Sequence, residues 1–236
     1  MPLILLWLSI LLTGLSCSRA RVTAPVPPSP LSEAQQNQFQ YYFFEGTTAK
    51  LIGKWEQAEQ FFARALSLDP GSAVTAYELG RIALQRGDGP KAQRMAQRAA
   101  QLDPLNPWYL QFLAQVYQNN GLPKEAADTW QRLIAMDNEH SLEALENLAN
   151  LHIQNKSYNE AMDCANALEQ KLGPQPEILD QKKNIWLLLG KKEKAIKEIQ
   201  RLVSLYPNEL GHRLGLVQTF SAEGQYDKAL SLLQEA

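Results

Sequence analysis

Three aspartates, Asp69, Asp103 and Asp137, recur at intervals of 34 residues. Carboxylates bind divalent cations and act as general acids or bases, so such a set could form a metal site or a hydrolytic site. Each aspartate, however, follows an expected helix, and the spacing places a whole structural unit between one carboxylate and the next. That separation is too large for shared ligation, so we expect all three to lie in helix-ending turns.

A cysteine and a histidine form the second candidate for chemistry. Cys164 is one of two cysteines in the chain, and His152 precedes it in the same structural unit. A thiol nucleophile needs a base within hydrogen-bond reach, but these two residues fall on different expected helices without a third partner. We therefore expect Cys164 to be a small buried side chain. The three histidines are far apart and no Cys/His spacing resembles a zinc site, so we expect no metal or other cofactor.

Two further patterns resemble binding motifs only in part. The segment Gly87-Asp88-Gly89 lacks the preceding strand and the Gly-Lys-Ser/Thr ending of a phosphate loop, which favours a turn between helices. Residues 182–197 are rich in lysine, but glutamates interleave with these cations, which is typical of a solvated face rather than a site for lipid or an acidic partner. The formal net charge is −2, which gives no general attraction for nucleic acid.

The element that must position all these residues is a repeat. An alanine recurs with steps of 34, 34, 35, 34 and 34 residues. A period near 34 indicates stacked units rather than one globular core. Within a unit, apolar residues follow helical spacing, as in Ala58, Phe62 and Ala65, and proline ends the second helix. The six periodic alanines are Ala58, Ala92, Ala126, Ala161, Ala195 and Ala229.

This pattern resembles the tetratricopeptide repeat, a helix-turn-helix unit of 34 residues. Gly46, Ala58 and Phe62 match its small residues at repeat positions 8 and 20 and its large residue at position 24. The resemblance implies an all-α fold, a right-handed α-α superhelix of about six repeats after a cleaved signal peptide. Ser32 and Gln35 have the spacing of a capping box, which begins the array at residue 32. The expected repeats lie near 39–72, 73–106, 107–140, 142–175, 176–209 and 210–236, the last one incomplete.

The last two repeats depart from the family pattern. Lys182 and Lys183 stand where the family prefers leucine and a small residue, and we expect their stems to lie on apolar surface with the amines in water. The sixth repeat reaches Ala236 inside its second helix, which leaves an apolar face that includes Leu230 and Leu233. We expect either a longer parent protein or a partner, possible self-association included, at this face.

The first residues are typical of a targeting segment. Residues 3–15 are almost wholly apolar, about the length of a signal-peptide core and too short to span a bilayer. The segment Gly14-Leu15-Ser16-Cys17 resembles a bacterial lipobox, which implies a lipoprotein-type signal peptide over 1–16 and lipidation of Cys17. The lipobox usually has leucine where Gly14 stands, so ordinary cleavage after Ala20 is the alternative. The four prolines of 17–31 predict an extended tether.

The family resemblance also implies where a ligand binds. In this family the first helices of successive repeats line a concave groove that receives peptides. Aromatic side chains gather in the first half of the expected groove and amides and acids farther along, which suits an extended peptide. The alternative is that Phe43, Tyr77 and Trp108 only pack between repeats. The expected groove residues are Phe43, Thr47, Tyr77, Arg81, Trp108, Gln115, Glu146, Asn150 and Asn184.

These observations favour binding over catalysis. We expect a non-catalytic scaffold of the bacterial cell envelope that holds a protein or peptide ligand and contacts the membrane through a lipid anchor. Ser18 after Cys17 resembles lipoproteins of the outer membrane, facing the periplasm; a secreted or periplasmic protein is the alternative. A second hypothesis is the N-terminal repeat module of a larger enzyme or sensor that continues past residue 236.

Overall fold

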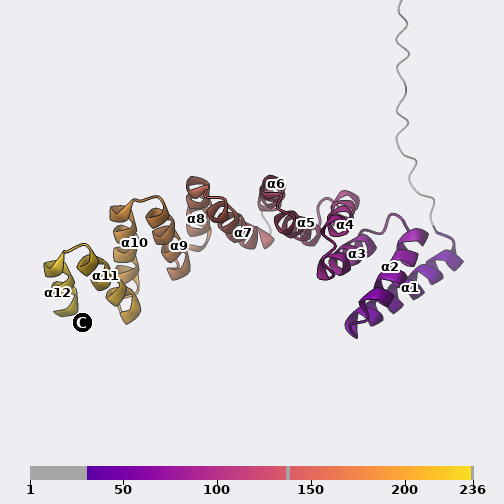
Figure 1. Cartoon of the computed structure of the whole chain (residues 1–236), viewed down its shortest axis with the longest axis horizontal. Coiled ribbons are helices and arrows are strands. Elements are labelled where there is room, and N and C mark those ends of the chain that lie inside the picture. Colours follow the sequence, from indigo (N-terminus) through magenta and orange to yellow (C-terminus); the bar gives the residue numbers. More distant parts are fainter. Residues whose placement is uncertain (1–30, 137–138, 235–236) are drawn as a thin grey trace, which may run out of the picture. The chain divides into compact units, whose positions relative to one another are not determined.

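A computed structural model describes residues 31–136 and 139–234. Within these ranges the chain forms twelve helices and no strand, which confirms the predicted all-α repeat fold (Figure 1). The expected signal segment 1–16, the lipidation site Cys17, the tether up to residue 30 and Asp137 lie outside the described residues. The helices are α1 (Glu33–Leu51), α2 (Trp55–Leu68), α3 (Ala73–Gln85), α4 (Gly89–Leu102), α5 (Pro107–Asn119), α6 (Pro123–Ala135), α7 (His140–Gln154), α8 (Tyr158–Leu172), α9 (Pro176–Leu188), α10 (Lys192–Leu205), α11 (Leu210–Ala222) and α12 (Tyr226–Gln234).

The helices are arranged as consecutive antiparallel pairs, each joined by a short turn (Figure 1). Each helix packs mainly on its two neighbours in the chain, so the contacts are local in sequence. The buried core is therefore spread along the array rather than gathered at one centre. The pairs are α1 with α2, α3 with α4, α5 with α6, α7 with α8, α9 with α10 and α11 with α12.

Side chains and prolines at the helix ends explain where the elements begin and stop. Ser32 and Gln35 form the predicted capping box: the Gln35 backbone N–H donates to Ser32 Oγ at 3.3 Å, and the Ser32 N–H donates to Gln35 Oε1 at 3.1 Å. Asp69 and Asp103 directly follow α2 and α4, as expected for residues of helix-ending turns. They lie at the ends of separate helix pairs, without a shared site.

The turn inside each pair depends on one residue with a positive φ angle. Gly121, between α5 and α6, has a φ of +69°, and glycines hold the same role in most other pairs. Between α7 and α8 this residue is Lys156, with a φ of +60°. A β-carbon is crowded in this backbone region, so lysine is strained there where glycine is not.

Small residues allow the paired helices to approach closely. The six periodic alanines are all buried, none more than 5% exposed. Phe62 and Trp130, each four residues after such an alanine, are completely buried and fill the space between helices. A β-carbon built on Gly46 would lie 3.0 Å from the Phe62 ring, so the ring rests directly on the glycine backbone.

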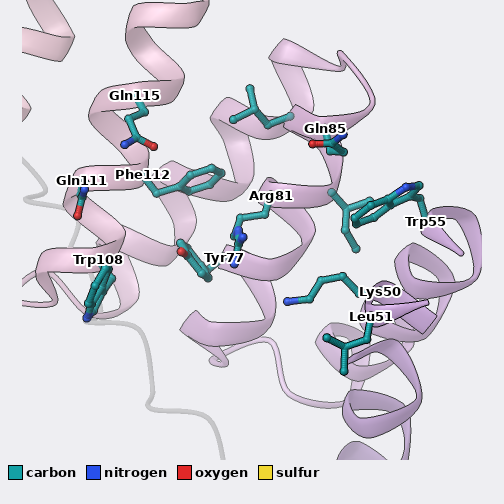
Figure 2. A pocket seen from close by; sticks show the side chains of 12 residues that line it. Lys50, Leu51, Trp55, Tyr77, Arg81, Gln85, Trp108, Gln111, Phe112 and Gln115 are labelled. Carbon is teal, nitrogen blue, oxygen red and sulfur yellow. The ribbon is translucent and has the colours of Figure 1, made fainter. Parts of the chain in front are cut away.

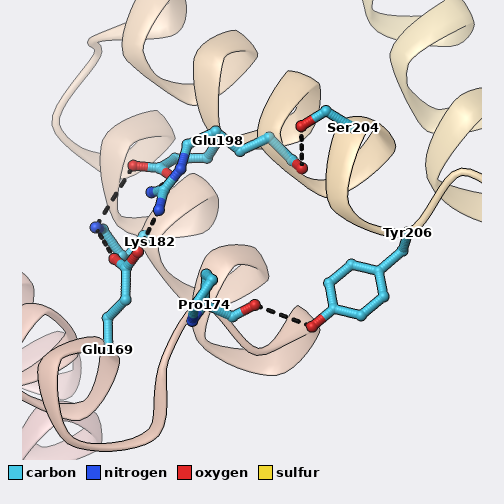
Figure 3. Close-up of polar contacts among 7 residues, drawn as sticks. Glu169, Pro174, Lys182, Glu198, Ser204 and Tyr206 are labelled. Carbon is cyan, nitrogen blue, oxygen red and sulfur yellow. Dashed lines mark hydrogen bonds and ion pairs between the residues drawn. The ribbon is translucent and has the colours of Figure 1, made fainter.

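The expectation that the Lys182 amine lies in water is wrong. Its amine does not reach water: the residue is 7% exposed, and Nζ lies 2.5 Å from Glu169 Oε2 and 3.7 Å from Glu198 Oε1 (Figure 3). Arg201 contacts the same two carboxylates. Where the family pattern has a leucine packed among apolar side chains, this chain has a cluster of charges from α8, α9 and α10. The cluster can be buried because each charge lies beside an opposite one.

Candidate functional site

A hollow lies over the first helices of the first three pairs, with Trp55 of α2 at its edge. It has a cavity volume of about 810 Å³, within the range of ligand sites. We call it the N-terminal groove, and Figure 2 shows its side chains converging from α1, α3 and α5. The lining residues are Lys50, Leu51, Trp55, Tyr77, Arg81, Ile82, Leu84, Gln85, Trp108, Gln111, Phe112 and Gln115.

Tyr77 is held at the middle of the groove by other aromatic rings. Its centroid lies 5.1 Å from that of Phe112, edge to face, and 5.2 Å from that of Tyr109. The Arg81 guanidinium lies over the Tyr77 ring, 5.6 Å from its centroid, as a cation–π contact. Burial raises the pKa of the Tyr109 hydroxyl, as do the nearby Asp103, Tyr77 and Glu78. Tyr109 therefore stays uncharged at neutral pH, and the packed rings give Arg81 a fixed support.

Trp108 presents an open aromatic surface at the α5 side of the groove. The residue is 57% exposed, although its ring meets the edge of His140 at a centroid distance of 4.6 Å. Indole rings bury large areas with little loss of side-chain entropy when a ligand covers them. An exposed tryptophan fixed on one side is therefore suited to anchor an apolar side chain of a ligand.

Three glutamines add hydrogen-bonding capacity. Gln85 and Gln115 are exposed on α3 and α5, so both amides are open to a ligand. Gln111 donates from Nε2 to Glu143 Oε1 on α7 at 2.6 Å, which fixes the orientation of its amide. Its Oε1 atom is buried and accepts no hydrogen bond from the part of the chain that the structure describes. An unpaired buried acceptor is costly, and this oxygen has too little accessible surface for a ligand in the groove to contact it.

The charges that line the groove are positive. Lys50 Nζ lies 2.7 Å from Glu78 Oε2, and both side chains are mostly buried, so this cation is already neutralised. Arg81 forms no ion pair with any carboxylate in residues 31–136 and 139–234. The groove thus carries one exposed cation that rests on an aromatic ring, with no lining Asp or Glu.

Four of the nine groove residues expected from sequence, Tyr77, Arg81, Trp108 and Gln115, line this hollow together. Phe43 does not: its ring packs on Phe62 at a centroid distance of 5.4 Å, a contact within the first helix pair rather than between repeats. The remaining four also lie elsewhere, with Thr47 donating to the Phe43 carbonyl at 2.9 Å and Glu146, Asn150 and Asn184 exposed on α7 and α9.

Sequence reasoning missed several lining residues. Trp55 begins α2, a second helix of its pair, and the family register assigns ligand contacts only to first helices. The apolar residues Leu51, Ile82, Leu84 and Phe112 were not among the expected groove residues, yet all four line the hollow. The sequence did offer one signal for this residue, since Trp55 is an aromatic residue that directly follows the turn residues Gly53 and Lys54.

A smaller cavity of about 390 Å³ lies among α9, α10 and α11. Asn184 lines it, with an apolar floor that includes Ile196 and Ile199. The charges at its rim are paired within the protein, as in Lys192 Nζ with Glu223 Oε1 at 3.0 Å. Because these groups satisfy each other, the cavity offers a ligand fewer polar contacts than the N-terminal groove.

The candidates for catalysis do not come together. Cys164 is buried on α8, and burial raises the pKa of its thiol to about 11, with a smaller contribution from Asp163. Burial lowers the pKa of His152, on α7, against an opposing effect of Glu160. No hydrogen bond joins Cys164 to His152 in the described chain, so the thiol stays protonated and a poor nucleophile at neutral pH. Nor do the described residues bring three His, Cys, Asp or Glu side chains into a group that could hold a metal ion.

The segment Gly87-Asp88-Gly89 is the expected turn between α3 and α4. Gly87 has a φ of +77°, and Asp88 Oδ1 accepts a hydrogen bond from the Lys91 backbone N–H at 3.0 Å, which caps α4. None of the helices in the described residues is long and apolar enough to cross a bilayer. The lysines of α10 are exposed as expected, whereas Lys182 is not.

Comparison with known families gives three matches to models of one repeat. Models described as tetratricopeptide repeat match residues 53–115, 112–176 and 184–209. Cellulose synthase operon protein C of Pseudomonas fluorescens (strain SBW25) is 30% identical over 107 residues. That alignment covers 45% of this chain and 8% of the relative, so the chain spans less than a tenth of that protein's length.

Solved structures share the fold at low identity. The MamA protein has a TM-score of 0.63 at 16% identity, with 72% of this chain and 92% of MamA covered. A tetratricopeptide repeat protein from Parabacteroides merdae has a TM-score of 0.62 at 17% identity, covering 84% and 78%. YrrB, described as a TPR protein with an unusual peptide-binding site, has a TM-score of 0.58 at 19% identity, covering 76% and 96%. These likenesses concern the fold.

Proposed function

Because this chain belongs to the tetratricopeptide repeat family, we propose that it is a non-catalytic scaffold whose N-terminal groove binds an extended peptide segment of a partner protein. The observation that carries the proposal is the convergence of Tyr77, Arg81 and Trp108, from two successive first helices, on one open hollow. Rings give a peptide contact area, and amides pair with its backbone. YrrB, a protein of similar fold with a peptide-binding site, supports the same use of such a surface.

The exposed amides of the groove give a second reason to expect a peptide. An extended chain carries backbone N–H and C=O groups at regular intervals, and each needs a hydrogen-bond partner. Gln85 and Gln115 offer both donors and acceptors to the same backbone. A purely apolar ligand would make no use of these two amides.

Capture of peptides from a random ten-residue library on immobilised protein tests the proposal. We expect peptides selected by the parent protein to bind at least tenfold more weakly to a variant with both Tyr77→Ala and Trp108→Ala, because two ring contacts are lost. Tyr226→Ala is the control, since Tyr226 is an exposed aromatic residue on α12 that lies outside the groove. Equal binding by the double variant and the parent protein would reject the groove as the binding surface.

We also propose that the scaffold works in the bacterial cell envelope, held to the outer membrane on its periplasmic side through lipidated Cys17. The support is the lipobox-like segment that ends at this residue and the apolar core before it. Expression of the full chain in a Gram-negative host with radiolabelled palmitate tests the anchor. We expect label in the parent protein and none in Cys17→Ser. A parent protein that carries no label and fractionates as a free periplasmic protein would favour ordinary cleavage.

Two further roles have specific support. The relative from Pseudomonas fluorescens shows that similar repeats can form a small part of a much longer protein, so this array could serve as a repeat module of an enzyme or sensor. Sequencing of the reading frame beyond residue 236 tests that role.

Leu230 and Leu233 are exposed on α12, which favours self-association there. A mass in light scattering that stays monomeric at all concentrations would exclude it.

A further inference from the structure

The N-terminal groove carries a charge preference, and this inference rests on the proposed function. We propose that it selects an extended peptide with an acidic side chain, Asp or Glu, which pairs with Arg81. The first observation is that none of the groove's lining residues is acidic, whereas two are basic. A surface of one sign favours a ligand of the opposite sign and disfavours one of the same sign.

Arg81 is the cation available to the ligand. Lys50 is occupied by Glu78 at 2.7 Å, with side chains only 19% and 13% exposed, so it offers little net charge. Arg81 is exposed, and no carboxylate of the described residues pairs with it. Its guanidinium can therefore form two parallel hydrogen bonds with an incoming carboxylate.

The aromatic cluster holds the guanidinium in place. Arg81 lies over Tyr77, whose other contacts are Phe112 and Tyr109. A planar cation stacked on a fixed ring loses less side-chain entropy when it binds a carboxylate. Tyr77 is thus a positioning residue, and phenylalanine should replace it without loss because the ring alone supports Arg81.

The place of Arg81 within the groove favours a side-chain carboxylate over the carboxylate of a chain end. Figure 2 shows Arg81 between two ends of the lining, with Lys50, Leu51 and Trp55 on one side and Trp108 and Gln111 on the other. A peptide that ended at Arg81 would leave half of this surface uncovered. A peptide that runs through the groove covers both halves and presents a side chain to Arg81. Since adjacent helices are about 10 Å apart and an extended chain advances about 3.3 Å per residue, we expect an apolar residue for Trp108 about three positions from the acidic one.

The test uses three pools of ten-residue peptides, degenerate except for a central Glu, Gln or Lys, with amidated ends. Immobilised parent protein should retain the Glu pool about fivefold more than the Gln pool and about tenfold more than the Lys pool at low salt, with the differences shrinking as salt rises. Arg81→Gln should abolish the preference for Glu, and Arg81→Glu should reverse it toward Lys. Tyr77→Phe should keep the preference for Glu, and Tyr77→Ala should reduce it.

Arg86→Gln is the matched control. Arg86 is also an exposed arginine, directly after α3, but it pairs with Glu59 at 2.7 Å and does not line the groove. We expect this variant to keep the preference for Glu, and circular dichroism should show that every variant remains helical.

The outcomes separate this inference from the proposed function. Equal retention of the Glu and Gln pools by the parent protein, with loss of both in the Tyr77→Ala and Trp108→Ala double variant, would overturn the acidic preference and leave peptide binding intact. Retention of the pools only when they are prepared with free carboxyl ends in place of amides would overturn the internal position of the carboxylate. Equal retention of all pools by the parent protein and the double variant would overturn both proposals.

Discussion

Lys182 on α9 donates to Glu169 on α8 across the boundary between two helix pairs, with Nζ and Oε2 2.5 Å apart (Figure 3). Arg201, from α10, contacts Glu169 as well and donates to Glu198 at 2.7 Å. Four charges from three helices are therefore connected in a largely buried place. Such a cluster is sensitive to the loss of one member, because the remaining charge stays buried without its partner.

The two partners of this contact should respond differently to substitution. We expect Glu169→Gln to lower the free energy of unfolding by about 2–3 kcal/mol, since Lys182 and Arg201 both lose their nearest anion. Lys182→Met should cost about 1 kcal/mol or less, because Arg201 still neutralises Glu169 and the methionine fills the space of the lysine stem. Urea unfolding followed by circular dichroism measures both. Equal losses in the two variants would contradict the asymmetry.

Acid should unfold this part of the array through Glu169. Burial alone would raise the pKa of this carboxyl, but the hydrogen bonds and charges of Arg201 and Lys182 outweigh it and hold the pKa below its ordinary value. The unfolded chain then binds more protons between the two values, so the stabilisation is present above about pH 4.3 and is lost as the pH falls through the lower, folded value.

The urea midpoint between pH 7 and pH 3 measures this effect. We expect it to fall less steeply on acidification in Glu169→Gln than in the parent protein. Glu146→Gln, at an exposed position on α7, should leave the parental slope unchanged. Parallel curves for the parent protein and Glu169→Gln would show that the buried carboxylate does not carry the acid sensitivity.

Cys164 should be inert until the chain unfolds. Burial raises the pKa of its thiol to about 11, so a negligible thiolate fraction exists at pH 7. In a Cys17→Ser variant, where Cys164 is the remaining cysteine, we expect almost no reaction with an aromatic disulfide reagent in buffer and complete reaction in high urea. Stoichiometric labelling of the native protein within minutes would mean that the thiol is accessible and activated.

The fold follows from sequence because its determinants are local and recur. The spacing of Ala58 and Ala92 defines a unit, and helix pairs that contact mainly their chain neighbours need no long-range information. The position of Lys182 was mispredicted for the opposite reason. Its partners Glu169 and Glu198 lie thirteen and sixteen residues away on other helices, and a pattern of single positions does not show that their carboxylates converge on one amine.

The candidate site was predictable in outline. Tyr77, Arg81 and Trp108 belong to the same register of successive first helices, so their convergence followed from the repeat. Phe43 has the same register as Tyr77, but its ring packs against Phe62 on α2, whereas Ala96 stands at the equivalent position of the second pair. Side-chain volume at one position thus decides whether an aromatic ring faces a ligand or the core.

Lys156 offers a direct test of the turn geometry. It holds a φ of +60° where other pairs have glycine, as at Gly121. We expect Lys156→Gly to raise the free energy of unfolding by about 1 kcal/mol, since glycine adopts this region without a β-carbon clash. Gly121→Ala should lower it by about the same amount for the same reason. A destabilised Lys156→Gly would mean that the unfolded-state entropy of glycine exceeds the strain.

The tight crossing of α5 and α6 should tolerate neither more nor less volume. Ala126 and Trp130 are completely buried one helical turn apart on α6, and Trp130 Nε1 donates to Gln118 Oε1 at 3.2 Å. We expect Ala126→Leu to cost about 1–3 kcal/mol through overpacking and Trp130→Ala about 3–5 kcal/mol through the cavity and the lost hydrogen bond. Asp128→Ala, on the same helix, serves as the control. Thermal unfolding measures the stability of all three variants. Because each repeat contacts only its neighbours, hydrogen exchange should show the losses first as local unfolding around α5 and α6. Exchange that rises evenly along all twelve described helices would instead mean that the array unfolds as one cooperative unit.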